Sequence, residues 1–231
     1  MSLASITAFK GMTTEEISRL EHGSLTLEPR DGAAIFAQGD PADAVYAITG
    51  GDGRVRIGAV DRQSKALMVE VFRAGDVFGE IAVIDGLSRT AAAVAEGRVR
   101  LVKLRQAAFL DALANCPTLG DALCRVMARR LRRTYELFQD ATFETLEVRL
   151  ARQVLYLAAT EGRPTPQGVR LTHRLRQADL ADLLGATTRS IITILNAWRA
   201  AGLVVYDTDR ALLTVKDTVA MRAIIDADAQ Q

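Results

Sequence analysis

The chain has 231 residues, and its 29 lysines and arginines nearly balance its 28 aspartates and glutamates, so its formal net charge is +1. Hydrophobic residues make up 49% of the sequence, which is typical of a globular protein and excludes collagen-like or disordered chains. No apolar run approaches the roughly 20 residues that a membrane span needs, and the N-terminal residues lack a signal-peptide pattern. We therefore expect a cytoplasmic protein without a membrane partner, built as one large or two smaller domains.

Cysteine usage indicates neither a disulfide framework nor a metal site. Cys116 and Cys124 are the only cysteines and lie eight residues apart in a helical pattern, so they are expected to be reduced thiols. The sequence also lacks a nucleophile elbow, a Walker loop and a zinc-binding helix. We therefore expect no catalytic activity, no metal and no obligatory cofactor.

Turn-rich, β-prone sequence fills the first half of the chain. Glycines are concentrated between Gly32 and Gly97, and turn residues there separate short segments that are β-rich or alternate between apolar and polar residues. Ahead of them, Thr13 and Glu16 form a capping box that predicts a short helix. Strands so short and so closely spaced predict an antiparallel roll or sandwich. The expected strands are residues 44–48, 53–60, 66–72, 91–95 and 98–104.

A long helix is predicted to begin at Pro117 and to run to about Ala141. A proline suits the first turn of a helix, and the rest of this span has no further proline and only one glycine, Gly120. One stripe of this helix has the alternating spacing of three and four residues that is typical of a coiled coil. The stripe predicts pairing with the same helix of a second chain. Packing within one chain is the alternative, because a second apolar stripe exists. The first stripe is Cys124, Met127, Leu131, Thr134, Phe138 and Ala141, and the second is Leu119, Leu123, Val126 and Leu137.

The C-terminal region resembles a DNA-reading module in its spacing. A helix is expected at about 145–160, followed by a loop at 162–168. Residues 177–195 fit two short helices that meet at Gly185. Two strands with a turn between them come next at 202–215, as the wing of a winged helix would. The second short helix has a polar face that suits the major groove of DNA, with Arg189 as the candidate base reader. The candidate DNA-binding residues are Thr187, Thr188, Arg189, Ser190, Thr193 and Asn196.

Residues 78–82 (FGEIA) and 89–91 (RTA) carry the densest chemistry. Gly79 allows backbone N–H groups to approach an anion closely. Arg89 offers a planar fork to phosphate oxygens, Thr90 adds a hydroxyl, and Glu80 can accept a hydrogen bond from a ribose hydroxyl. Together they suit a phosphodiester that carries a ribose. The alternative is a tight turn in which Glu80 and Arg89 form a surface ion pair.

These two motifs resemble the phosphate-binding cassette of cyclic-nucleotide-binding domains. With the long helix and the terminal winged helix-turn-helix, nearly the whole chain is similar to the Crp/Fnr family of bacterial transcription regulators. The resemblance implies an α+β fold: an N-terminal antiparallel β-roll (the cyclic-nucleotide-binding jelly roll), a long dimerisation helix and a C-terminal winged helix-turn-helix. The expected domains are residues 1–116, 117–143 and 144–231.

The resemblance also implies partners: a second copy in a homodimer, double-stranded DNA with a palindromic operator, and cyclic AMP as the allosteric ligand. RNA polymerase is a further candidate. In the family's cyclic-AMP-binding site the phosphate would lie on Arg89 and Thr90, the ribose on Glu80, and the base on Thr134. The remaining ligand-binding candidates are Gly79, Ile81, Ala82 and Tyr135.

Two departures from the family's pattern leave alternatives open. Tyr135 stands where a serine is found in the cyclic-AMP-binding member, so selectivity for cyclic AMP over cyclic GMP stays open. Two further alternatives are a pocket that no longer binds a ligand and a pocket that binds a different small-molecule effector. Thr188, Arg189 and Thr193 replace an Arg-Glu-x-x-x-Arg pattern, so a different operator is expected. A redox or haem sensor is disfavoured, because the chain has only two cysteines and two histidines, His22 and His173.

Overall fold

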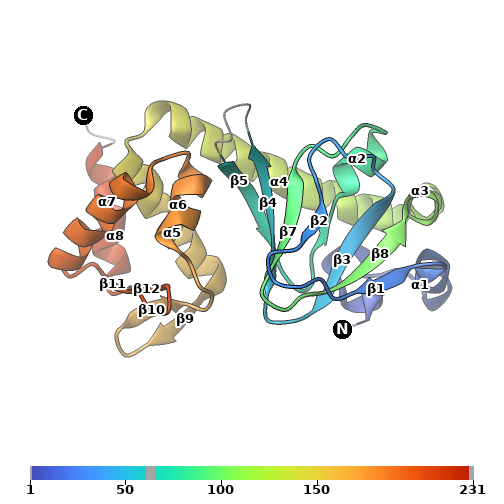
Figure 1. Cartoon of the computed structure of the whole chain (residues 1–231), viewed down its shortest axis with the longest axis horizontal. Coiled ribbons are helices and arrows are strands. Elements are labelled where there is room, and N and C mark those ends of the chain that lie inside the picture. The colour runs from blue at the N-terminus through green and yellow to red at the C-terminus, as the bar shows by residue number, and fades with distance from the viewer. Residues whose placement is uncertain (1, 61–65, 229–231) are drawn as a thin grey trace. The chain divides into compact units, whose positions relative to one another are not determined.

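The computed structural model describes residues 2–60 and 66–228. The chain divides into two compact units, one that ends at Arg133 and one that begins at Thr134. Each unit is built around its own buried apolar residues. The long helix α4 (Pro117–Phe143) contributes residues to both units (Figure 1), and its bounds confirm the helix expected from Pro117 onward.

The first unit is an antiparallel β-roll, as the sequence predicts. Its described residues form two four-stranded sheets, ordered β1-β8-β3-β6 and β2-β7-β4-β5 (Figure 1). All of their strand pairs are antiparallel. The strands are β1 (Leu25–Leu27), β2 (Ala34–Phe36), β3 (Ala44–Gly50), β4 (Arg54–Val60), β5 (Ala66–Phe72), β6 (Val77–Phe78), β7 (Ala92–Glu96) and β8 (Arg100–Arg105).

Short helices complete this unit. The capping box of α1 (Thr14–Glu21) is confirmed, since Thr13 Oγ1 accepts from the Glu16 N–H at 3.2 Å and the Glu16 carboxylate accepts from the Thr13 N–H at 2.6 Å. The others are α2 (Glu80–Ile84), α3 (Gln106–Asn115) and the 3₁₀ turns Leu3–Ser5 and Thr7–Phe9. A core of buried apolar side chains joins these helices to strand β3 and to the start of α4.

Several elements of this unit were not predicted. Strands β1, β2 and β6 have only two or three residues each, which is too short for an alternating pattern to be recognised. Helix α3 was missed because Phe109 is its only fully buried residue, so its apolar period is weak. Strand β3, whose apolar sequence does not alternate, is buried from Ala44 to Thr49 because both of its faces are covered.

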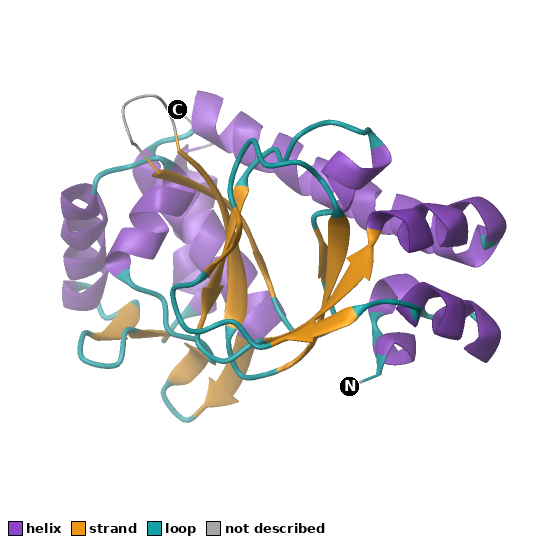
Figure 2. Ribbon diagram, turned by 45° about the vertical axis from the view of Figure 1, so that its right-hand side comes forward, coloured by secondary structure: helices purple, strands orange, loops and turns teal. Residues whose placement is uncertain are grey.

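The second unit contains the winged helix-turn-helix. Its described strands form one antiparallel sheet, ordered β11-β12-β10-β9. Figure 2 colours the helices of the chain purple and its strands orange. The segment expected to be a loop at 162–168 is a hairpin, in which Gly168 has φ 120°. The elements are α5 (Leu146–Glu161), β9 (Gly162–Thr165), β10 (Gly168–Leu171), α6 (Gln177–Leu184), α7 (Thr188–Ala200), β11 (Val204–Asp207), β12 (Leu212–Val215) and α8 (Thr218–Asp228).

Candidate ligand site and DNA-reading helix

Gly79 forms the turn at the centre of the candidate phosphate-binding cassette, between β6 and α2. Its φ of 79° lies in the left-handed region that favours glycine. A Cβ at this position would lie 2.8 Å from Arg89 Nη1. Glycine is therefore required both by the backbone conformation and by the close approach of the arginine. The Ala82 side chain after it is buried, whereas Ile81 is exposed.

Arg89 lies beneath this turn and is only 3% exposed. Its Nη1 donates to the Gly79 carbonyl at 2.7 Å and its Nη2 donates to the Ala44 carbonyl at 2.7 Å. The guanidinium also lies over the Phe36 ring, 4.3 Å from the ring centroid. Its Nε is buried and has no hydrogen-bond acceptor among the residues that the structure describes. The guanidinium is thus held rigidly and still has donor capacity for an anion.

Asp43 and Lys103 form an ion pair beside Arg89. Asp43 Oδ1 lies 3.6 Å from Arg89 Nη2, and Asp43 Oδ2 lies 2.6 Å from Lys103 Nζ. The hydrogen bond from Lys103 holds the pKa of the Asp43 carboxyl below its usual value. The neighbouring Tyr46 is buried, which raises the pKa of its phenol. Asp43 therefore places a negative charge beside the Arg89 guanidinium.

Glu80, the first residue of α2, is 2% exposed and is paired with a residue of the long helix. Arg130 Nη1 lies 2.5 Å from Glu80 Oε1, and Arg130 Nη2 donates to the Val77 carbonyl at 2.6 Å. The Arg130 guanidinium also lies 4.4 Å from the centroid of the Phe72 ring. The alternative of a surface ion pair between Glu80 and Arg89 is wrong, since both side chains are buried and Glu80 pairs with Arg130 instead.

Two further carboxylates are electrostatic neighbours of Arg130. Burial raises the pKa of Glu70 and the pKa of Asp76 above their usual values, while Arg130 acts on both in the opposite direction. Arg130 is one of five arginines between Arg125 and Arg133 of α4. Its position on the long helix, four residues before Thr134, was the one sequence feature that could have indicated a role in the ligand site. Nothing in the sequence distinguished it from the neighbouring arginines.

The remaining ligand candidates are exposed. Thr90 follows the buried Arg89 and is exposed. Thr134 and Tyr135 lie on α4 in the second unit and are exposed. The structure therefore brings together Gly79, Glu80, Ile81, Ala82, Arg89 and Thr90 within the first unit.

The first stripe of α4, the coiled-coil seam, is also largely exposed in the single chain. Within it Leu131 is 55% exposed and Phe138 67%, and the adjacent Tyr135 is 61% exposed. Met127, assigned to the same stripe, is partly buried against the core of the first unit, and Leu119 and Leu123 of the second stripe are fully buried there. The beginning of the second stripe thus packs within the chain, whereas most of the first stripe is left uncovered.

The helix-turn-helix has the expected geometry. Leu180, Leu184 and Ile191 are buried between its two helices and the rest of the core, and Gly185 adopts a left-handed conformation (φ 61°) in the turn. Thr187 caps the recognition helix α7, because its Oγ1 accepts from the Ser190 N–H at 3.1 Å. The sequence thus places the end of α6 and the beginning of α7 correctly.

The candidate DNA-binding residues are residues 187–190 at the beginning of α7, and Thr193 and Asn196 further along it. Arg189 is exposed, and Thr193 Oγ1 donates to its backbone carbonyl at 3.0 Å. Ser190 is half-buried and its hydroxyl lies 2.8 Å from that of Thr187. Thr188 and Asn196 are exposed, as the capping Thr187 is. The wing expected after this helix is confirmed as the antiparallel pair β11 and β12.

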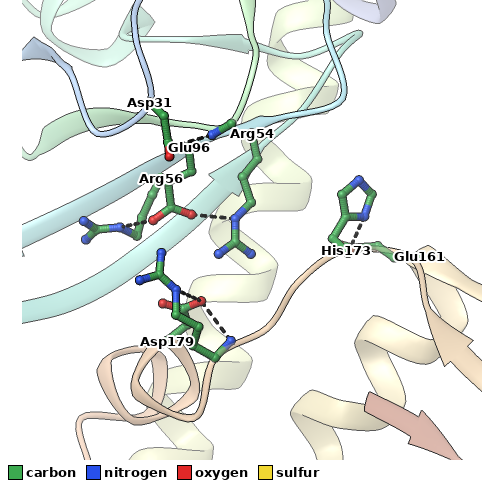
Figure 3. Close-up of polar contacts among 9 residues, drawn as sticks. Asp31, Arg54, Arg56, Glu96, Glu161, His173 and Asp179 are labelled. Carbon is green, nitrogen blue, oxygen red and sulfur yellow. Dashed lines mark hydrogen bonds and ion pairs between the residues drawn. The ribbon is translucent and has the colours of Figure 1, made fainter. Parts of the chain in front are cut away.

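Other polar clusters have a structural explanation. Glu96 on β7 lies between Arg54 and Arg56 on β4, with ion pairs of 2.6 and 2.9 Å (Figure 3). These pairs join neighbouring strands of one sheet. Among the described residues no group of His, Cys, Asp or Glu could hold a metal ion, and none of the described helices is long and apolar enough to cross a membrane.

Comparisons with known proteins agree with this architecture. Residues 27–116 match the cyclic nucleotide-binding domain family and residues 148–224 match the Crp-like helix-turn-helix domain family. The chain is 31% identical over 224 residues to the CRP-like cAMP-activated global transcriptional regulator of Mycobacterium tuberculosis, covering 96% of this chain and 98% of that protein. It is 28% identical over 197 residues to the cyclic AMP receptor protein of Thermus thermophilus, covering 85% and 87%.

A solved structure shows the same fold. The c-di-GMP responsive global regulator CLP of Xanthomonas campestris superposes with a TM-score of 0.77 at 21% identity, over 89% of this chain and 100% of that one. A β-roll that matches the cyclic nucleotide-binding domain, followed by a winged helix-turn-helix, defines a DNA-binding transcription regulator. The chain belongs to the Crp/Fnr family, which confirms the resemblance and the fold class inferred from the sequence.

Proposed function

We propose that this protein is a homodimeric transcription regulator that is gated by cyclic AMP and acts in the cytoplasm, where it binds a palindromic operator. Its working parts are a sensor roll at residues 1–116, a dimerisation helix at 117–143 and a DNA-binding domain at 144–231. The observation that carries the ligand proposal is Arg89. A buried guanidinium that is held by two backbone carbonyls and keeps its Nε without an acceptor fits an anionic ligand.

The chemistry of the cassette fits a cyclic phosphodiester. Arg89 and the Thr90 hydroxyl would bind the phosphate, and Gly79 would let the backbone approach it closely. Glu80 would accept from the ribose hydroxyl, and Ile81 and Ala82 complete the turn. Since Glu80 also pairs with Arg130 of α4, a ribose that engages Glu80 changes the surroundings of an α4 side chain. Ligand binding and the state of α4 are thereby coupled through one carboxylate.

The base is assigned to Thr134, with Tyr135 beside it. A hydroxyl within an otherwise mostly apolar seam offers a hydrogen bond to a base, and Tyr135 adds a ring and a second hydroxyl. Pairing of two chains along Leu131, Thr134 and Phe138 would cover the exposed seam. Two recognition helices would then lie about 34 Å apart, one turn of DNA, with Arg189 reading a base and Thr187, Thr188, Ser190, Thr193 and Asn196 contributing phosphate or base contacts.

Calorimetric titration of cyclic AMP into the purified protein, with cyclic GMP as the control ligand, tests this proposal. We expect saturable binding of cyclic AMP that Arg89→Ala abolishes and that Arg98→Ala, a change at an exposed arginine, leaves intact. Thermal unfolding checks that both variants are folded. Absence of heat with cyclic AMP would refute the ligand assignment.

A different effector is the second candidate, and Tyr135 is the observation that favours it. A tyrosine in place of a serine adds bulk at the position assigned to the base, and a protein of the same fold is named as responsive to c-di-GMP. Titration of cyclic di-GMP is therefore the third arm of the experiment. Binding of that ligand alone, lost in Arg89→Ala, would replace cyclic AMP and keep the cassette.

A further inference from the structure

Helix α5 connects three other helices of the second unit through three of its side chains. Glu147 accepts from Trp198 Nε1 of the recognition helix α7 at 2.8 Å. Arg149 donates to the backbone carbonyl of Leu184, the last residue of α6. Arg152, one turn further along α5, reaches back to the end of α4. The first two contacts lie within the helix-turn-helix domain, whereas the third joins it to the long helix.

The guanidinium of Arg152 contacts two carboxylates, one on α4 and one just after it. Its Nη1 lies 2.9 Å from Asp140 Oδ1, and its Nη2 lies 2.7 Å from Glu144 Oε1. Asp140 is on the last turns of α4, and Glu144 is in the connection between the two helices. A planar guanidinium that binds two carboxylates fixes direction as well as distance, which a lysine could not do.

The surroundings make this contact restrictive. Asp140 is 8% exposed, and a carboxylate that is buried to this degree is costly to leave without its cationic partner. The connection between α4 and α5 is short, since only Glu144 and Thr145 separate Phe143 from Leu146. Thr145 is itself committed to capping α5. The angle between α4 and α5 is therefore determined over a few residues, and Arg152 is the side chain that spans them.

We propose that Arg152 is a positioning residue for DNA recognition: it locks the end of α4 to the winged helix-turn-helix, so that both move as one body. The seam residues Thr134 and Phe138 lie on the same part of α4, within the second unit. In a dimer that pairs along this seam, the clamp fixes the spacing of the two recognition helices. This inference depends on the proposed dimer and does not depend on the identity of the ligand.

A comparison of full operators with half-sites tests this role. The DNA probe is the duplex that the wild-type protein enriches from a randomised library, and three derivatives of it: a single half-site, and full sites with one base pair added or removed between the halves. Arg152→Gln, as the full chain, is compared with the wild type by fluorescence anisotropy. Arg125→Gln is the matched control, because it breaks an exposed ion pair with Asp121 (2.9 Å) elsewhere on α4.

The proposal predicts a split between the two kinds of site. Arg152→Gln should bind the half-site as the wild type does, bind the full site about tenfold more weakly, and lose its preference for one spacing. The exchange Arg152→Glu with Glu144→Arg restores one ion pair and should recover part of the preference. Equal weakening on half-site and full site would overturn the proposal, because it would show a loss of domain structure. Unchanged spacing preference would overturn it too.

The same data distinguish a failure of the proposed dimer. A wild-type protein that binds the half-site and the full site equally well, and is monomeric by light scattering, would overturn the dimer and the positioning role together. A wild type that discriminates between spacings, with an Arg152→Gln variant that does so equally, would overturn only the role of Arg152.

Discussion

Arg130 of the long helix and Glu80 of the cassette form an ion pair of 2.5 Å in which the carboxylate is 2% exposed. The pair links a helix that is mostly exposed along its seam to the turn that would bind the ligand. The same Arg130 guanidinium donates to the Val77 carbonyl and stacks on Phe72. One side chain of α4 thus donates both to the Glu80 carboxylate and to a backbone carbonyl just before the cassette.

Loss of Arg130 alone should therefore destabilise the roll. Arg130→Gln leaves the buried Glu80 carboxylate without its cation, and we expect a loss of about 3 kcal/mol in the free energy of unfolding. The double variant with Glu80→Gln removes both charges and should recover most of that loss. Urea unfolding measures both. A single variant as stable as the wild type would show that the pair contributes nothing.

Glu70 gives a pH-dependent prediction. Burial raises the pKa of its carboxyl above the usual value of 4.5, so the folded state binds its proton more tightly than the unfolded state does. Its contribution to stability is most favourable below pH 4.5 and declines as the pH rises through the raised pKa. Glu70→Gln should therefore be more stable than the wild type at pH 7, and the difference should shrink toward pH 4.5.

Thermal unfolding of both proteins between pH 4.5 and 7 measures that difference. Glu15→Gln, on the exposed side of α1, is the control and should show little change across the series. An advantage of Glu70→Gln that grows as the pH falls would contradict the assignment.

Arg189 should determine part of the operator sequence. Arg189→Ala removes an exposed guanidinium from the polar face of α7 and should cost about 1 to 3 kcal/mol on the preferred site, with relaxed preference at one base pair. Selection from a randomised library with each protein reports the preference directly. An identical binding logo for the variant would exclude Arg189 as a base reader.

Phe138 should contribute to the dimer and little to the fold of one chain. Its side chain is 67% exposed, so Phe138→Glu should leave the unfolding temperature of the monomer unchanged while introducing a like charge on both sides of the seam. Light scattering over a concentration series should show a shift toward monomer. A dimer as tight as that of the wild type would move the interface elsewhere.

The sequence was most informative for features that depend only on neighbouring residues, such as the ends of helices and tight turns. The capping box at Thr13, the start of α4 at Pro117 and the left-handed turn at Gly185 were all predicted correctly, because each depends on the chain within a few residues of it. The two-residue strand β6 has no such signature, since its pairing partner β3 lies about thirty residues earlier in the chain.

Side-chain partners were less predictable than elements. The cassette motif indicated Glu80 and Arg89, but the sequence could not show that Glu80 pairs with Arg130, fifty residues later in the chain. In the sequence, Arg130 is one of five arginines between Arg125 and Arg133, and the structure shows that its side chain reaches Glu80. The ion pair between Asp43 and Lys103 beside Arg89 was also not predicted, because the two residues come close only when strands β3 and β8 pair.

The proposed function requires that the ligand gates DNA binding. The most direct test measures the affinity of the wild-type protein for its selected operator at increasing concentrations of cyclic AMP. The Arg89→Ala variant is measured in parallel. The proposed function predicts that saturating cyclic AMP tightens wild-type binding by about tenfold or more, within the usual range of allosteric coupling. The affinity of Arg89→Ala should not respond. Cyclic AMP that binds the protein in the calorimeter yet leaves the operator affinity of the wild type unchanged would contradict the account.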